Sequence, residues 1–195
     1  MAANETRMLL LGAVAMFAPV NGYQIRRELV SWQIDKWAHV QPGSIYHGLT
    51  TLARQGFLVR HDLVDGTREV AVYEITDEGR ALLDRMLVAA LETVDPYDRV
   101  AFHVAFGMLP LLTRRQVTAS LTVRRTALEQ AVAEFVRGKD DPHNGPPHAR
   151  RGWVLWMDLA VAELAWLREA IDDIRAGRLK FAPGEDWGWT PPLDD

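Results

Sequence analysis

Apolar residues recur at helical spacing in three segments before residue 56, and this spacing predicts three helices. The first segment, residues 6–17, is apolar with few breaks and ends before Pro19, so we expect a helix buried against others. The second follows a cap at Asn21, and the third begins at Pro42, where proline favours the first helical turn. A loop over residues 35–41 separates these two. Their inward positions are Ile25, Leu29 and Trp32 in one helix, and Ile45, Leu49 and Leu52 in the other.

After Gly56 the pattern changes to that of β-strands. Residues 57–64 and 68–75 are rich in Val, Leu and Tyr, and a turn is expected at Asp65-Gly66 between them. An Asp-Gly pair between two such runs is among the stronger hairpin signals. Three helices followed by a hairpin predict a winged helix-turn-helix, and acidic residues from Thr76 onwards predict the start of a fourth helix.

A second helical region is expected after Pro96. It should hold a helix over residues 98–109, and another from the capping box Thr113-Arg-Arg-Gln116 to about Gly138. Residues 139–152 contain three prolines and two glycines, which is typical of an exposed loop. The last long helix ends before Gly177, and its apolar residues have the spacing of a coiled-coil seam: Met157, Ala160, Leu164, Leu167, Ile171 and Ile174.

The predicted fold is therefore mainly α-helical with a small β-hairpin. We expect a winged helix-turn-helix DNA-binding domain over residues 1–94 and a carboxy-terminal region of antiparallel helices over residues 95–180, for dimerisation and effector binding. Residues 181–195 read as an irregular tail. The seam residues Leu164, Leu167 and Ile171 are expected in the core or in a dimer interface.

Composition narrows the class of protein. The chain has 195 residues, 48% of them hydrophobic, which is ample for a packed core. No run reaches the roughly 18 apolar residues of a membrane helix, and the apolar patch Met8–Val20 lacks a signal-peptide cleavage pattern. We therefore expect a soluble, cytoplasmic protein. The absence of cysteine excludes disulfide scaffolds, thiolate catalysis and the common structural zinc sites.

Enzyme functions find little support in the motifs. The chain has no Gly-x-Ser-x-Gly elbow and no dinucleotide glycine fingerprint, and residues 43–48 lack the Lys-Ser/Thr of a phosphate-binding loop. The histidines have no ligand spacing, and the acidic pairs read as surface charge. We expect no enzyme, no metal and no cofactor.

The outward face of the third helix suggests DNA binding. It carries small or hydrogen-bonding residues that could approach a duplex and present donors to bases and phosphates, although an ordinary solvated helix face would look the same. Residues 1–80 hold eight basic and nine acidic residues, so DNA binding must rest on where the bases lie. The candidate DNA-binding residues are Ser44, Tyr46, His47, Thr51 and Arg54 on the helix, with Arg60 and Arg68 on the hairpin. His61 lies beside them.

Five short motifs, in this order, resemble the PadR family of transcriptional regulators. They are Gly12-Ala-Val-Ala, Asn21-Gly-Tyr-Gln-Ile, Pro42-Gly-Ser-Ile-Tyr46-His-Gly-Leu, Gly56-Phe-Leu, and Tyr73-Glu-Ile-Thr-Asp-Glu-Gly79. The resemblance implies a winged-helix repressor that acts as a homodimer through a helical carboxy-terminal region, here similar to the larger subgroup and to virulence-activator regulators. One departure is Gly48, in the middle of the third helix. Glycine there costs roughly 1 kcal/mol relative to alanine, so it either permits close approach to DNA or marks a weaker helix.

Tryptophan is abundant in the carboxy-terminal half. The resemblance implies a response to phenolic or drug-like aromatic effectors, and the candidate effector-binding residues are Trp153, Trp156, Met157 and Trp166. The alternative for these residues is dimer-interface packing, where tryptophan is enriched. Trp187 and Trp189 lie in the tail.

The hypothesis is a homodimeric repressor that binds a palindromic operator in double-stranded DNA and is released by a small aromatic effector. Its rival is a helical protein-interaction module with a winged-helix fold that does not bind DNA, which the lack of a net basic amino-terminal half favours. A third possibility is a protein that sequesters a small molecule.

Overall fold

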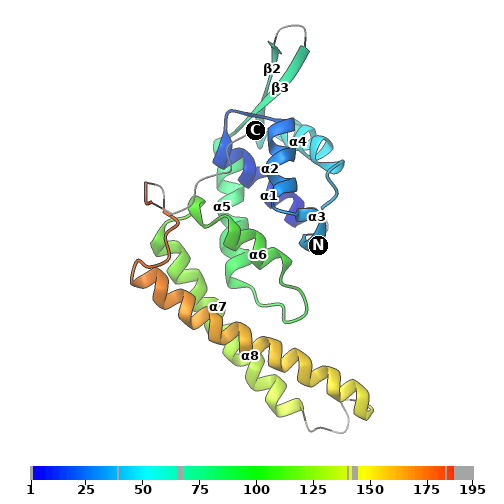
Figure 1. The fold of residues 1–195 in the computed structure, drawn as a ribbon, viewed down its shortest axis with the longest axis vertical. Coiled ribbons are helices and arrows are strands. Elements are labelled where there is room, and N and C mark those ends of the chain that lie inside the picture. Colours follow the sequence, from blue (N-terminus) through cyan, green and yellow to red (C-terminus); the bar gives the residue numbers. More distant parts are fainter. Residues whose placement is uncertain are drawn as a thin grey trace. The chain divides into compact units, whose positions relative to one another are not determined.

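The computed structural model of the chain describes residues 2–38, 40–65, 68–139, 141, 145–182 and 184–186, and only the backbone of residues 2, 3, 65 and 68. The described chain is mainly helical with one small antiparallel sheet, as the sequence predicts (Figure 1). It divides into two compact units. Unit 1 comprises residues 1–90 and 100–111, and unit 2 comprises residues 91–99 and 112–195. The functional boundaries at residues 94 and 180 stay predictions.

Unit 1 contains the predicted helices and hairpin together with two elements that the hydrophobic pattern did not indicate. Its helices are α1 (Ala2–Phe17), α2 (Gly22–Ser31), α3 (Ile34–Trp37), α4 (Ser44–Arg54), most of α5 (Asp77–Glu92), α6 (Val100–Gly107) and the 3₁₀ turn η1 (Leu109–Leu111). Its strands are β1 (Val20–Asn21), β2 (Leu58–Asp65) and β3 (Arg68–Ile75). The order of the strands in the sheet is β1-β3-β2.

The additional elements are β1 and α3. β1 is only two residues long and pairs with β3, with Val20 opposite Tyr73. α3 is a single helical turn inside the predicted loop over residues 35–41, and Gln33 precedes it with a positive φ of 56°. Elements this short have no hydrophobic period of their own. The helix predicted over residues 98–109 also divides, into α6 and η1.

Local capping explains where α2 begins. The Asn21 side chain accepts a hydrogen bond from the Gln24 backbone N–H (2.9 Å), and the Gln24 side chain accepts one from the Asn21 N–H (3.1 Å). This capping box satisfies two of the donors that every helix leaves free at its amino terminus. The cap predicted at this position is confirmed.

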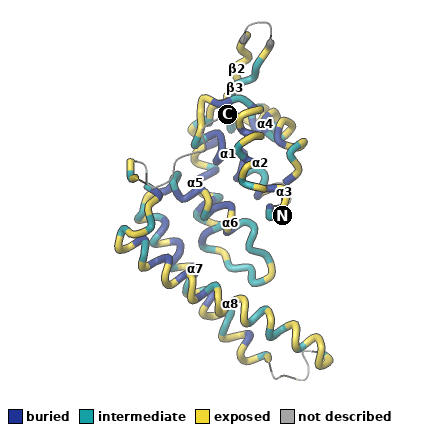
Figure 2. The backbone as a smooth tube through the Cα atoms, viewed as in Figure 1, coloured by how far each residue is buried: buried dark blue, intermediate teal, exposed yellow. Residues whose placement is uncertain are grey.

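The predicted hairpin is present, and its strands begin and end within one residue of the predicted ranges. β2 and β3 pair antiparallel from Leu58 opposite Ile75 to Asp65 opposite Arg68. The predicted turn at Asp65-Gly66 falls partly on residues 66–67, which lie outside the described residues. The apolar stripes predicted for α1, α2 and α4 form the core of unit 1 (Figure 2). The fully buried leucines and isoleucines of this core include Leu9, Leu10, Leu11, Ile25, Leu29, Ile45 and Leu49.

Unit 2 is built on an antiparallel pair of long helices, α7 (Arg114–Gly138) and α8 (Pro147–Arg175). Thr113 and Gln116 form the predicted capping box at the start of α7. α8 starts at Pro147, so the loop predicted over residues 139–152 is too long by most of two turns. Proline at the first helical position explains this start, because its missing N–H would have no helical partner there. Gly177 follows the end of α8 with φ 69°, as predicted.

The seam predicted on α8 packs inside a single chain. Leu164, Leu167 and Ile171 are buried between α8 and α7, where Val117, Leu121 and Leu128 are also buried. This burial supports the core alternative for the seam. A second chain would have to contact other residues of α8.

Charged residues also lie in the core of unit 2. Arg124, 1% exposed, contacts Glu163 with its Nη2 2.5 Å from Oε1, and its Nη1 donates to the Thr93 carbonyl. Arg99 Nε donates to the other Glu163 oxygen at 2.7 Å. One carboxylate therefore serves two guanidinium groups. These contacts hold the segment over residues 93–99 against α7 and α8.

The described part of the predicted tail is anchored to α7. The Arg114 guanidinium donates to the carbonyls of Ile174 and Leu179, pairs with Glu185 at 2.5 Å, and lies 4.9 Å from the centre of the Phe181 ring. Phe181 is buried. The region has no helix or strand, as predicted, but the contacts of Arg114 give it a defined path.

Candidate nucleic-acid interface

Helix α4 separates an apolar inner face from a polar outer face. Ile45, Leu49 and Leu52 are buried in unit 1, as predicted. The residues that face outward are Tyr46, His47, Thr50 and Arg54, all of them exposed. Thr50 is not among the DNA-binding residues predicted from the sequence. An outer face of this kind presents hydrogen-bonding groups without an apolar patch.

Several hydroxyl groups on α4 already donate hydrogen bonds to the protein. Ser44 Oγ donates to the Gln41 carbonyl (2.8 Å) and Thr50 Oγ1 donates to the Tyr46 carbonyl (3.0 Å). Arg54 Nη2 donates weakly to Thr51 Oγ1 at 3.4 Å. In this arrangement the hydroxyl groups of Ser44 and Thr50 can only accept from a base, whereas Arg54 retains further donors for a base or a phosphate.

Gly48 is explained by helix packing. A β-carbon built on Gly48 would lie 2.4 Å from Leu10 Cδ1 in α1, and Leu10 is 1% exposed. The side of α4 that carries Gly48 therefore faces α1. The sequence suggested that this glycine permits close approach to DNA or marks a weaker helix. Its contacts show close approach to α1 instead.

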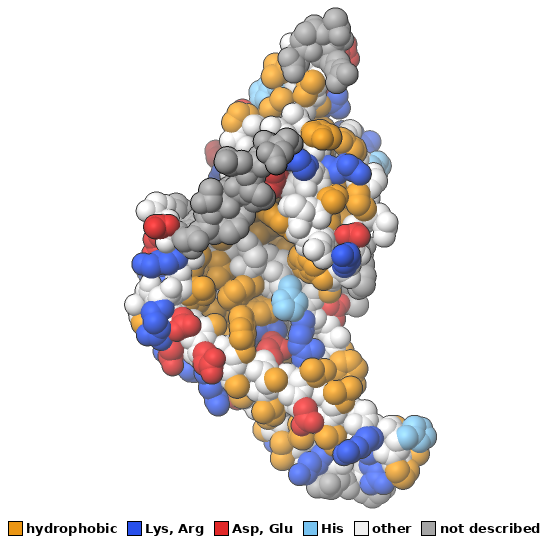
Figure 3. Space-filling model, in the orientation of Figure 1, with side chains coloured by type: hydrophobic (Ala, Val, Ile, Leu, Met, Phe, Trp, Pro, Cys, Tyr) orange, Lys and Arg blue, Asp and Glu red, His pale blue; other side chains and the backbone are white. Residues whose placement is uncertain are grey.

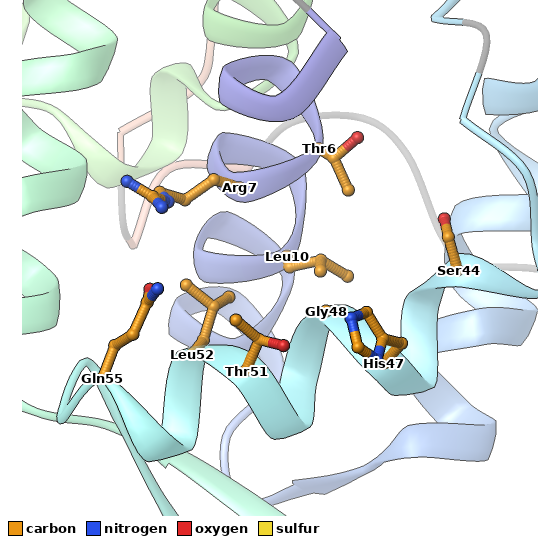
Figure 4. Close-up of a pocket in the computed structure, with 9 residues that line it drawn as sticks. All are labelled: Thr6, Arg7, Leu10, Ser44, His47, Gly48, Thr51, Leu52 and Gln55. Atoms are coloured by element: carbon orange, nitrogen blue, oxygen red, sulfur yellow. The ribbon is translucent and has the colours of Figure 1, made fainter.

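Ser44, His47 and Thr51 lie along a groove between α1 and α4. We call it the α1–α4 groove, and Figure 4 shows the residues that line it. It encloses about 290 Å³. The lining residues are Thr6, Arg7, Leu10, Ser44, His47, Gly48, Thr51, Leu52 and Gln55. Three of the predicted DNA-binding residues are thus brought together beside α1, with Arg7 as an additional cation that the sequence did not single out.

Tyr46 lies on the opposite flank of α4. Its ring contacts α2, because a β-carbon on Gly22 would lie 3.0 Å from Tyr46 Cδ1. The ring lines a second groove of about 280 Å³ that also includes Asn21, Tyr23 and residues of β3. Tyr46 is 47% exposed and Tyr23 is 62% exposed. Both phenol groups are accessible here, and Tyr23 is absent from the residues predicted by sequence.

The hairpin is less basic than its arginines suggest. Arg60 pairs with Asp62, with Nη2 2.7 Å from Oδ1, and the hydrogen bond to Asp62 raises the pKa of Arg60. His61 lies 4.0 Å from Glu74. The side chain of Arg68 lies outside the described residues. Residues 58–75 contain two arginines against Asp62, Asp65, Glu69 and Glu74. A net acidic hairpin is a poor electrostatic clamp for a phosphate backbone.

The predicted effector residues do not share one environment. Trp153 and Trp156 pack against Phe135 and Tyr97, with ring centroids 5.1 Å and 5.2 Å apart, and Trp153 Nε1 donates to the Phe135 carbonyl. Trp166 is 42% exposed. Met157 is half-buried. The role of these four residues in effector binding stays a prediction.

A different aromatic cavity lies inside unit 1. It encloses about 290 Å³ and we call it the Trp32 cavity; its lining residues are Leu9, Trp32, Trp37, His103, Val104, Gly107 and Met108. Trp37 Nε1 donates to the Trp32 carbonyl at 2.7 Å, and this hydrogen bond holds the Trp37 indole against the backbone of Trp32. The sequence analysis missed this cavity because its residues come from four elements that lie far apart along the chain.

Neither a metal site nor a membrane-spanning helix is present among the described residues. No cluster of three or more His, Asp or Glu residues there has the arrangement of a metal site. Among the helices of the described chain, none combines the length and apolar character needed to span a membrane.

The fold and the α4 surface define a class of protein. Helices α1, α2 and α4, with the single-turn α3 between α2 and α4, are followed by the β2–β3 hairpin. With a polar outer face on α4, they form a winged helix-turn-helix. Residues 10–85 match the model of the transcriptional regulator PadR-like family. This match confirms the resemblance carried by the five motifs, over the residues that it covers.

Similar chains exist among solved structures. One is PadR of Bacillus subtilis in complex with operator DNA, 18% identical, with a TM-score of 0.39 over 86% of this chain and 98% of that chain. Another is smu.1604c from Streptococcus mutans UA159, 16% identical, with a TM-score of 0.39 over 89% of this chain and 98% of that chain. No curated protein matches the sequence.

Proposed function

We propose that the protein is a homodimeric transcriptional repressor that binds a palindromic operator with α4 in the major groove. The observation that carries the proposal is the outer face of α4, where Tyr46, His47, Thr50 and Arg54 are exposed beside a fully buried apolar face. The PadR-like family match over the same residues supports it. A helix with such a face fits the width of the major groove and can reach base edges.

Roles follow from the chemistry of each group. Arg54 and His47 are assigned to base edges, because Arg54 retains donors and His47 lies at the outer edge of the helix. Thr51 and Ser44 accept from bases or flank them. Tyr46, Arg60 and Arg68 are assigned to phosphates. To contact a phosphate, Arg60 must first break its ion pair with Asp62.

Dimerisation is assigned to the exposed side of α8. The seam residues are buried in one chain, whereas Leu155, Leu159 and Trp166 are 57%, 42% and 42% exposed. Steps of four and seven residues put all three on one helical face. A second copy that packed on this face would hold two α4 helices for successive major grooves, about 34 Å apart. The operator would then be a palindrome.

Release by a small aromatic effector is assigned to the Trp32 cavity. Its two indoles and His103 suit a flat molecule with one polar group, whereas the Trp153 and Trp156 rings are already packed against other aromatic rings. Gly107 lines the cavity, and a β-carbon there has nothing within 4 Å, so a leucine fits at this position and should narrow the cavity. With 4-hydroxycinnamate as the probe, Gly107→Leu should abolish the release of DNA, whereas Trp153→Phe should preserve it. The reverse pattern would move the effector site to unit 2.

DNA binding itself is tested by fluorescence anisotropy. The purified chain is titrated with its own upstream region and with a scrambled duplex, each at two salt concentrations. Tight, salt-sensitive preference for the upstream region is expected, and Arg54→Ala should reduce that preference. Arg68→Ala should weaken binding to both duplexes and lower the salt slope. Arg85→Ala, which removes an exposed arginine from α5, is the matched control.

The rival function has one observation in its favour. β2 of the acidic hairpin exposes Val59, Leu63 and Val64, with Val64 75% exposed, as in a surface that meets another protein. Equal and weak binding to both duplexes would contradict DNA recognition and favour a protein-interaction module.

A further inference from the structure

The cations available around α4 are few. The chain has a net charge of −4, and in unit 1 Arg60 and Arg27 pair with Asp62 and Glu28. Basic and acidic side chains also alternate along α7 and α8 on the face shown in Figure 3. A protein that binds DNA needs cations without carboxylate partners where the phosphates run. Beside α4, two arginines meet this condition within the described residues: Arg54 on the helix and Arg7 on α1.

The contact between Leu10 and Gly48 brings Arg7 to this position. Arg7 precedes Leu10 by three residues, so both side chains lie on the same face of α1. Because Gly48 has no side chain, α1 approaches α4 closely enough for Arg7 to line the same groove as Ser44, His47 and Thr51. Figure 4 shows Arg7 and Gln55 at one end of the groove, with Ser44 and His47 at the other end.

The chemistry of the α1–α4 groove fits one segment of sugar-phosphate backbone. A guanidinium group can donate two parallel hydrogen bonds to phosphate oxygens, and the Gln55 amide and His47 ring can supply further donors. The floor, Leu10 and Leu52, is apolar and can cover the edge of a deoxyribose. Among the described side chains of the hairpin, the one arginine, Arg60, is already paired with Asp62.

We propose that the α1–α4 groove binds a phosphate of the DNA backbone that borders the major groove, with Arg7 as the principal cation. This inference rests on the proposed function. It adds α1 to the DNA-binding surface, and it gives α1 a contact with the backbone in addition to those assigned to the hairpin. It also gives Gly48 an indirect part in DNA binding, because the close packing of α1 on α4 positions Arg7.

The test compares three variants: Arg7→Ala and the control Arg85→Ala each remove one positive charge, whereas Arg7→Lys keeps it. For Arg7→Ala we expect affinity for operator DNA to fall about tenfold, and the slope of log affinity against log salt to decrease by about 0.9, the value for one phosphate contact. Arg7→Lys should keep the slope and lose part of the affinity, since ammonium lacks the bidentate geometry. Arg85→Ala should change neither quantity. Circular dichroism and thermal unfolding establish that each variant is folded.

A second arm separates DNA from a free anion, because both carry the same oxyanion. Thermal unfolding of the wild type is measured without DNA, in inorganic phosphate and in chloride at equal ionic strength. An unchanged salt slope for Arg7→Ala would overturn the proposal. If phosphate stabilised the wild type but not Arg7→Ala, with DNA affinity unchanged, the groove would be a site for a small anion instead. A wild type that binds no DNA would overturn the proposed function and this inference with it.

Discussion

Leu10 packs so closely against Gly48 that the structure leaves no room for a β-carbon at position 48. The nearest Leu10 atom, Cδ1, would lie 2.4 Å from a β-carbon at position 48. Leu10 is 1% exposed, so neighbouring core residues hold it in place. This single contact sets the distance between α1 and α4, and with it the width of the α1–α4 groove.

Gly48→Ala should destabilise the protein. The change gains about 1 kcal/mol of helix propensity, but overpacking a full core costs about 1–3 kcal/mol, so we expect a net loss. Gly152→Ala is the control, because a β-carbon on that glycine of α8 meets nothing within 4 Å and only the propensity gain remains. Urea unfolding measures both variants. A more stable Gly48→Ala protein would show that α1 can move away from α4 without cost.

The buried carboxylate of Glu163 should matter more than an exposed one. Glu163→Gln removes the negative charge that pairs with the Arg124 and Arg99 guanidinium groups, and breaking a buried pair in this way costs about 3–5 kcal/mol. Glu129→Gln breaks the exposed pair with Arg168, where about 0.2–1 kcal/mol is expected. The free energy of unfolding in urea distinguishes them, and equal losses would contradict the burial argument.

Removal of the acid beside Arg60 should strengthen DNA binding if the hairpin meets the duplex. Asp62→Asn releases the Arg60 guanidinium from its ion pair and removes one negative charge. We expect affinity to rise about twofold to fivefold, equivalent to roughly 0.5–1 kcal/mol. Asp84→Asn on α5 makes the same change of charge elsewhere and serves as the control. Equal effects of the two substitutions would mean that the hairpin makes no close contact with DNA.

The contacts of Glu185 should give unit 2 a dependence on acid pH. Hydrogen bonds from the Ala182 N–H, the Arg114 guanidinium and the Phe181 N–H lower the pKa of Glu185 from its ordinary value of 4.5. A lowered pKa in the folded state means that the stabilisation is complete above the unfolded pKa and is lost as pH falls through the folded one. The difference in stability between wild type and Glu185→Gln should therefore be constant near neutral pH and shrink below about pH 4.5. A difference that does not vary with pH would contradict the role of this carboxylate.

Local sequence signals predicted the helices and the hairpin because their causes are local. The capping boxes at Asn21 and Thr113 need only residues three apart, and the hairpin needs only alternation around a turn. The same signals failed for β1 and α3, which are too short to show a period. β1 exists because β3 offers it a partner more than fifty residues later in the chain.

Part of the candidate site was predicted because it depends on local sequence signals. The outer residues of α4 follow from helical periodicity, and the PadR motifs identify the family to which residues 10–85 belong. Arg7 could not be associated with them, because only the packing of α1 on α4 brings it near. The Trp32 cavity is a similar case, since α2, α3 and α6 contribute to it from separate parts of the sequence.

The sequence by itself determined the long helices and the hairpin, which face of each helix is apolar, and the family that residues 10–85 resemble, because propensity, period and capping act over a few residues. Tertiary structure decided which surfaces remain available. It buried the α8 seam within one chain, paired Arg60 with Asp62, and placed Arg7 beside α4. These outcomes depend on contacts between residues far apart in the chain, whose geometry is set only when the elements pack.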